Sequence, residues 1–487
     1  MFRIDATVGA AILLVLVAGV VPAFGGADPG PERDRSLTAG DARLSQKVER
    51  AVDRDPATGN AGSGVRAIRA DHVRARGTTG SGVRVGIVGS GFDASSRAVG
   101  PHVAARRRFS DDAFGPRVTA HDTAVAEVVS ETATSSDLYL ASVGRTPTAA
   151  DYAEAIAWLV ERDVSVIVDS GSYFPTVEGE SARITNAAER AVDSGVVFVT
   201  SAGNYANRHW SGRGVTDGWV VFDDGVEANA LANGSPTRGR VSLRLRWSSG
   251  ADYDLYLYRR TPFGGDRVVA ESATRESDPG RTIEAIDVAV PRGRYYVAVH
   301  AHRGVDSPGS VQLFAAYHAL EHATARGSMV APATSDHVIT VGASGDGGQQ
   351  GYTSRNAAGR VDVNAPGWAQ TAAVPGLTGT SAAAPYVAGT AALMQSRNRN
   401  LSPAEIETVL ERTAGTDVDA LAAVDAVSGT TSVPADRSVS ADRGRAFGPG
   451  GAAATDGTPP SSAVGAVANA TRNETRPDAR GDDGRSA

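Results

Sequence analysis

The sequence contains no cysteine, and this absence has the widest consequences. Disulfide bonds, thiolate zinc sites and cysteine nucleophiles are all excluded. Lysine is nearly absent too, since Lys47 is the only one and arginine supplies the other positive charges. The formal net charge is −7 over 487 residues, so the sequence predicts no broad basic surface and no nucleic-acid partner. A hydrophobic content of 41% is ordinary for a folded protein of two or three domains.

The N-terminal segment is apolar and bears on location. An uncharged run, Ala6 to Phe24, follows Arg3. A short basic start, an apolar run and small residues are typical of a secretory signal, and the run is nearly long enough to span a bilayer. The sequence therefore predicts an extracellular or cell-surface protein. Whether residues 1–28 are a cleaved signal or a retained membrane anchor stays open.

Apolar strands alternate with helical patterns from residue 83 onward. Strands are expected at 83–88, 137–143, 164–172 and 196–204, with helices at 121–133, 151–163 and 182–195 between them. Such alternation is typical of a parallel sheet with helices on both faces. The predicted fold class is therefore α/β, with three layers.

A different pattern interrupts this rhythm. Stretches such as "RVSLRLRW" at 240–247 and "DYDLYLYRR" at 252–260 alternate apolar with polar residues and are separated by Gly, Pro and Asp turns. Short period-two strands at this spacing indicate an antiparallel β-sandwich. The expected organisation is a signal or anchor at 1–28, a linker or reduced pro-segment at 29–76, an α/β domain at 77–208 and 326–428, an inserted sandwich at 209–325, and a disordered tail at 429–487.

Three short motifs carry residues suited to catalysis. "GTSAAAP" at 379–385 places a serine at the start of a helix of small residues, "SAGN" ends a strand at Asn204, and His121 opens the helix "HDTAVAEVV". Taken singly, each fits a plain cap, turn or surface residue. In this order on one α/β frame, they resemble the subtilisin-like serine peptidases. The resemblance covers roughly residues 77–205 and 331–428, and "DYDLYLY" is similar to exported members that carry a β-sandwich before the nucleophile.

The resemblance implies a role for each matched residue. Ser381 would be the nucleophile and His121 its general base and then acid. Asn204 and the backbone N–H of Ser381 would stabilise the oxyanion. The segment Ser170, Gly171 and Ser172 lies where the family pairs with its substrate, so a protein or peptide would add there as an extended strand. The expected reaction is hydrolysis of peptide bonds through an acyl-enzyme.

The sequence departs from the family at the catalytic acid. In "VRVGIVGSGFD" the acid position holds Gly89, and the position after it holds Ser90. Asp93 is the candidate substitute, four residues past Gly89. Asp122 is not expected to reach His121, because neighbours on a helix point about 100° apart. We therefore expect a peptidase weakened by the missing acid, in which Gly89→Asp would raise activity.

The alternative is a non-catalytic pseudopeptidase that binds peptides or cell-surface material. Ser381, His121 and Asn204 favour the enzyme, whereas the missing acid favours the binder. No cofactor and no metal ligands are predicted. Acidic pairs such as Asp223 and Asp224 lack the spacing of a calcium loop, so structural calcium has no motif behind it.

Overall fold

The computed structural model describes residues 13–14, 63–110, 119–248, 250–273, 282–303 and 308–428, all within one compact unit, Met1–Ser432. The expected tail at 429–487 lies outside these ranges, and so does the expected signal or anchor apart from two residues. In the described ranges no helix combines the length and the apolar character needed to cross a membrane.

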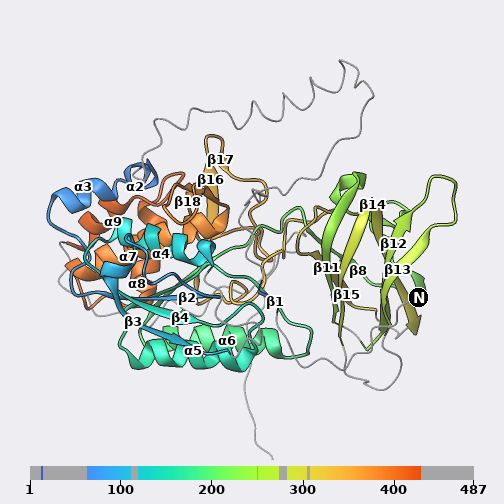
Figure 1. Cartoon of the computed structure of the whole chain (residues 1–487), viewed down its shortest axis with the longest axis horizontal. Coiled ribbons are helices and arrows are strands. Elements are labelled where there is room, and N and C mark those ends of the chain that lie inside the picture. The colour runs from blue at the N-terminus through green and yellow to red at the C-terminus, as the bar shows by residue number, and fades with distance from the viewer. Residues whose placement is uncertain are drawn as a thin grey trace, which may run out of the picture. The chain divides into compact units, whose positions relative to one another are not determined.

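An eight-stranded sheet forms the centre of the α/β domain (Figure 1). Its order is β17-β16-β7-β5-β2-β4-β3, and β18 also pairs with β16. Every pairing is parallel except the one between β16 and β17. The strands are β2 (Arg84–Gly89), β3 (Val103–Arg108), β4 (Asp137–Ser142), β5 (Val166–Asp169), β7 (Val197–Ser201), β16 (Ile339–Gly345), β17 (Gly348–Gln349) and β18 (Val363–Pro366).

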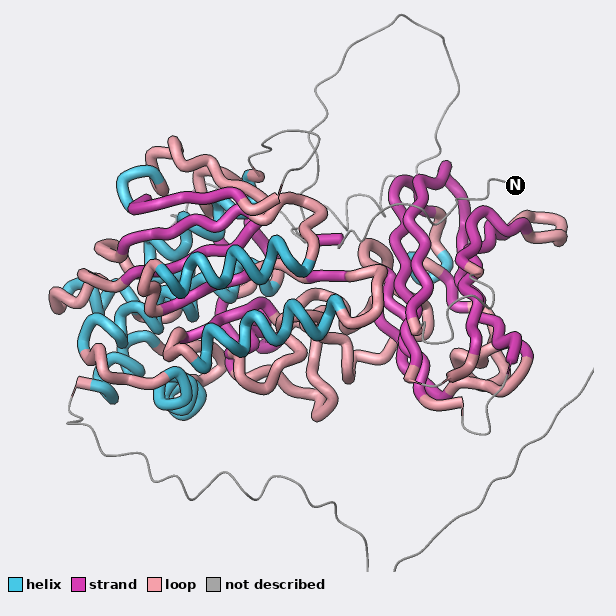
Figure 2. Tube along the Cα trace, turned by 90° about the horizontal axis from the view of Figure 1, so that it is seen from below, coloured by secondary structure: helices cyan, strands magenta, loops and turns pink. Residues whose placement is uncertain are grey.

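Helices cover both faces of this sheet, as the sequence predicts. Val85 and Ile87 of β2 join a core with the helices on one face, whereas Val88 joins the core on the other. The first face carries α4 (Ala120–Thr132), α7 (Thr380–Arg397), α8 (Pro403–Thr413) and α9 (Ala420–Val427). The second carries α5 (Ala149–Glu161) and α6 (Glu180–Asp193), which lie in front of the strands in Figure 2. Each fully buried Val, Leu or Ile contributes about 1.5–3 kcal/mol, so these two layers supply much of the domain's stability.

The α/β domain begins earlier than the boundary expected at residue 77. Two short helices, α2 (Ser63–Ala67) and α3 (Ala70–Ala75), precede β2. Their Val65 and Val73, with Ile68 between the helices, are buried in the same core as α4 and α7. Residues 63–75 are therefore part of the folded domain and not a linker.

The segment after residue 208 forms an antiparallel sheet, consistent with the expected inserted domain. Its strands are β8 (His209–Arg213), β9 (Gly218–Trp219), β10 (Asn229–Ala230), β11 (Thr237–Trp247), β12 (Asp252–Arg260), β13 (Arg267–Ser272), β14 (Ile283–Arg303) and β15 (Ser310–Ala315). The first half of β14 pairs with β11 and its second half with β12. Leu243 and Leu245 of β11 and Leu255 and Leu257 of β12 consequently share one hydrophobic core.

The remaining elements are short. Strand β6 (Tyr173–Phe174) pairs antiparallel with β1 (Leu13–Leu14), and β19 (Trp368–Ala369) pairs with β20 (Leu377–Thr378). Two 3₁₀ turns, η1 (Gly100–His102) and η2 (Ala232–Gly234), complete the described structure.

Candidate active site

The predicted nucleophile lies at the start of the buried helix α7. Its N-cap, Gly379, has φ 92°, and a Cβ there would lie 2.8 Å from Nδ2 of Asn204. The backbone N–H of Thr380 donates to Oδ1 of Asn204 at 3.1 Å. Ser381 follows as the second helical residue, where backbone N–H groups have no acceptor within the helix. The loop thus brings Ser381 and Asn204 together at a positive helix end.

The predicted substrate segment meets the same helix end. The Ser381 hydroxyl donates to the backbone carbonyl of Ser170 at 3.2 Å, and the Ser170 hydroxyl donates to the carbonyl of Ser381 at 3.3 Å. The next residue, Gly171, donates its N–H to Asp169 and accepts a bond from Ser201 at 3.4 Å. These bonds fix the backbone of 170–171 beside the nucleophile.

His121 and Ser381 stand on two helices that start at the same edge of the sheet. The helix α4 begins beside the end of β2, because the N–H of Thr119 donates to the carbonyl of Gly91. The helix α7 begins beside the end of β5, which is the neighbour of β2 in the sheet. The two helices pack so closely that a Cβ at Gly389 would lie 2.5 Å from the Cβ of Thr132. Both helices therefore present their first residues at the carboxyl ends of β2 and β5.

The imidazole of His121 is held by its neighbour in sequence. Its Nδ1 lies 2.8 Å from Oδ1 of Asp122, and the two side chains are 6% and 4% exposed. The prediction that Asp122 does not reach the imidazole of His121 is wrong. The 100° offset separates the Cα–Cβ directions, but Nδ1 and Oδ1 each lie two bonds beyond Cβ and meet in the first turn of α4.

The second carboxylate oxygen of Asp122 is held from the end of β2. Oδ2 accepts from the Ser90 hydroxyl at 3.0 Å, from the Gly91 N–H at 3.1 Å and from the Thr119 hydroxyl at 2.5 Å. Burial alone would raise the pKa of Asp122, but the hydrogen bond and charge of His121, with the bonds from Thr119 and Gly91, bring it below its usual range. Asp122 is therefore a buried and ionised carboxylate.

Asp93, the substitute acid named from the sequence, has other partners. Its carboxylate accepts from the N–H of Ser95 at 3.0 Å and from the hydroxyl of Ser95 at 2.5 Å. Those two bonds lower the pKa of this solvent-facing Asp93. Because Asp122 occupies Nδ1 of His121, the structure does not support Asp93 as the acid. Two features of the sequence were the signal for this arrangement, the glycine at the acid position 89 and the aspartate directly after His121.

The other nitrogen of His121 is available. Among the described residues, Nε2 is buried and has no hydrogen-bond partner. In this conformation the Ser381 hydroxyl is bonded to the Ser170 carbonyl instead. A buried imidazole nitrogen without a partner is costly unless another group uses it.

A second buried carboxylate, Asp169, ends β5 beside the site. Burial and, as a smaller cause, the charge of Asp122 raise the pKa of Asp169 to about 6, against opposing hydrogen bonds from Gly171, Tyr152 and Tyr173. The Tyr152 hydroxyl donates to Asp169 at 2.8 Å. Asp169 thus belongs to a buried polar network under the substrate segment.

Glu127 anchors the loop that precedes Ser381. Its carboxylate accepts from the N–H of Ala372 at 2.6 Å and from that of Ala373 at 3.2 Å. The side chain is almost fully buried, on the same helix as His121. Glu127 therefore ties α4 to the chain that leads into β20 and Ser381.

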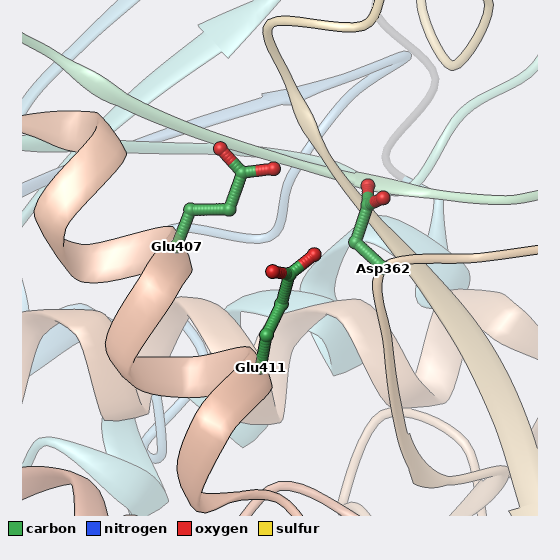
Figure 3. Close-up of side chains that lie close together, drawn as sticks. All are labelled: Asp362, Glu407 and Glu411. Carbon is green, nitrogen blue, oxygen red and sulfur yellow. The ribbon is translucent and has the colours of Figure 1, made fainter. Parts of the chain in front are cut away.

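One carboxylate cluster of the described part has the spacing of metal ligands. Oxygens of Asp362, Glu407 and Glu411 lie within 4.8 Å of one another (Figure 3). Asp362 already accepts from the N–H and the hydroxyl of Thr340 at 2.8 and 2.7 Å, and Glu411 is exposed. Calcium takes six to eight oxygen ligands, and exposed acidic groups often gather without an ion. The cluster alone does not carry a calcium site.

The fold and the residues at the start of α7 define the class of the protein as a subtilisin-like serine peptidase. The chain belongs to the subtilase family, because residues 80–450 match the family model of that description. Among curated proteins, no sequence matches significantly.

Three solved structures are similar to this chain. The CspB protease of Clostridium perfringens aligns with a TM-score of 0.53 and 16% identity over 75% of this chain and 99% of that one. A cold adapted subtilisin-like serine proteinase gives 0.39 and 15% over 69% and 83% of the two chains. The prenylagaramide maturation protease PagA gives 0.41 and 12% over 74% and 99%. At these identities the first of them supports the fold alone, and the TM-scores of the other two are too low to add to it.

Proposed function

We propose that this subtilase is an active, exported serine endopeptidase that cleaves proteins or peptides through an acyl-enzyme at Ser381. The observation that carries the proposal is the reciprocal pair of hydrogen bonds between Ser381 and Ser170, made beside Asn204. It joins a nucleophile, an oxyanion donor and a substrate-pairing segment at one helix start. Those three functions are what acyl transfer from a peptide requires.

The chemistry follows from these contacts. An extended substrate pairs beside residues 170–172, and the edge of β6 already pairs with β1 in this way. The Ser381 hydroxyl turns from the Ser170 carbonyl to Nε2 of His121, which has no other partner in the described structure. Oγ bonds to the substrate carbonyl carbon as its proton passes to Nε2.

The negative charge then falls on the former carbonyl oxygen. Oδ1 of Asn204 accepts from Thr380, so its amide nitrogen faces away from that bond and donates to the oxyanion with the Ser381 N–H. His121 next gives its proton to the leaving amine, and the C–N bond breaks. Water then attacks the acyl-enzyme as His121 takes its proton. His121 returns that proton to Oγ of Ser381, and the bond between Oγ and the acyl carbon breaks.

The second candidate, a pseudopeptidase that binds peptides, is favoured by one observation. The Ser381 hydroxyl is bonded to a carbonyl and not to the imidazole in this conformation. Catalysis thus requires the Ser381 hydroxyl to leave this carbonyl and turn toward the imidazole. In a pseudopeptidase the Ser381 hydroxyl would stay bonded to the Ser170 carbonyl.

A fluorophosphonate probe, which reacts only with activated serines, separates the two. We expect labelling of the full chain and none of Ser381→Ala. Ser130→Ala is the matched control, because that hydroxyl donates only within its own helix to Ala126 at 2.9 Å, and it should keep full labelling. A folded wild-type chain that resists the probe would leave the pseudopeptidase as the better account.

A further inference from the structure

The carboxylate of Asp122 fills the space that a side chain at Gly89 would need. A Cβ built on Gly89 would lie 2.7 Å from Cγ of Asp122, and 2.9 Å from both its Cβ and its Oδ2. Such distances are shorter than real non-bonded carbon contacts. The family resemblance places its acid at position 89, so the carboxylate group has the same location but enters from α4 and not from β2.

Hydrogen bonds hold both oxygens of the Asp122 carboxylate in place. One oxygen faces the imidazole, and the other accepts from Ser90, Gly91 and Thr119. Ser90 and Gly91 directly follow Gly89, so the strand that lacks the acid supplies donors to the acid on the helix. A carboxylate held by several donors keeps one position and one charge state.

We propose that Asp122 is the positioning residue of this peptidase and that Gly89 is its required counterpart, the two having exchanged the roles that the family gives to the strand and the helix. Asp122 accepts a hydrogen bond from the Nδ1–H of His121, which leaves the lone pair of Nε2 to take the Ser381 proton. It also stabilises the imidazolium formed in the transition state. The effect on rate rests on the proposed function, but the contact between Asp122 and the imidazole does not.

The first test removes the charge while keeping the shape. Asp122→Asn is expected to lower kcat by about 10⁴-fold with little change in KM, since an amide favours the wrong imidazole tautomer. The matched control is Asp93→Asn, which removes a nearby carboxylate bonded only to its own turn. It should keep kcat within a few-fold. Equal losses in the two variants would overturn the assignment.

The second test returns the acid to the strand. Gly89→Asp alone should lower activity, contrary to the expectation from sequence, because its Cβ collides with Asp122. Asp122→Gly alone should lose about 10⁴-fold. The double variant should recover at least tenfold over Asp122→Gly. A double variant no better than Asp122→Gly, with unchanged circular dichroism, would show that the two positions do not share one role.

A third measurement needs no activity. ¹⁵N NMR of the neutral imidazole in a Ser381→Ala background reports which nitrogen carries the proton. We expect Nδ1–H for His121, and a shift to Nε2–H when Asp122→Asn is added. An unchanged tautomer would refute the inference. A changed tautomer in a chain that resists the fluorophosphonate would uphold the inference and refute the proposed function.

Discussion

Replacing Asp169 with Asn is expected to stabilise the protein at pH 8 but not at pH 4. Burial raises the pKa of Asp169 from 3.8 to about 6. Between these two values the folded chain keeps a proton that the unfolded chain has released, so the stability contributed by this group falls as pH rises through that window. Above pH 6 the loss is complete. Asn does not titrate, and the variant escapes this loss.

The magnitude follows from the two pKa values. They differ by about two pH units, and each is worth ~1.36 kcal/mol, which gives at most about 3 kcal/mol. The amide can still accept from the N–H of Gly171, whereas Tyr152 must turn its hydroxyl to accept a bond from the new NH₂ group. The cost of that turn is the same at both pH values and cancels when the two differences are compared.

The assay is urea unfolding at pH 4 and pH 8, in a Ser381→Ala background that prevents self-cleavage. Asp336→Asn serves as the control, because Asp336 is exposed and its replacement should change stability equally little at both pH values. We expect Asp169→Asn to gain about 1–3 kcal/mol at pH 8 relative to pH 4. A gain that does not depend on pH would refute the linkage argument.

Three further changes test the site and its support. Asn204→Ala removes an oxyanion donor and should lower kcat by about 10²–10³-fold with KM nearly unchanged in steady-state assays, the cost seen for such a donor in subtilisin. Gly379→Ala should lower kcat more than tenfold, because φ is 92° and the new Cβ would lie 2.8 Å from Nδ2 of Asn204; unaltered kinetics would contradict this loop geometry. Glu127→Ala leaves the N–H groups of Ala372 and Ala373 without their carboxylate; the free energy of unfolding should fall by about 2–4 kcal/mol in urea titrations, and a change below about 0.5 kcal/mol would argue against the anchor.

The layered fold was predictable because its signals are local. The central strands β2, β5 and β7 are apolar runs. The covering helices show either an amphipathic pattern, as at 151–163, or small apolar residues, as at 381–397. The strands of the inserted segment alternate apolar with polar residues at period two, which is the sequence pattern of antiparallel strands. The domain boundary at 77 was wrong because α2 and α3 are short and polar in composition, and only packing shows that Val65 and Val73 are buried.

The acid was missed for a different reason. Whether Asp122 reaches Nδ1 of His121 depends on side-chain rotamers in one helical turn and on empty space above Gly89. Neither appears in a pattern of residue types. Gly89 and Asp122 considered together would have raised the possibility, but only coordinates show that a side chain at position 89 and the carboxylate of Asp122 would occupy one volume.

The inserted segment begins and ends at neighbouring positions. Its first and last strands, β8 and β15, are neighbours, with His209 opposite Phe314 and Arg213 opposite Ser310. A disordered loop between β7 and β16 would carry an entropic cost of closure, whereas a folded module with adjacent ends acts as a short hairpin. Modules of other lengths could therefore occupy the same junction during evolution without disturbing the parallel sheet. A ribosome-bound chain, however, cannot place β16 beside β7 until the whole module has been synthesised.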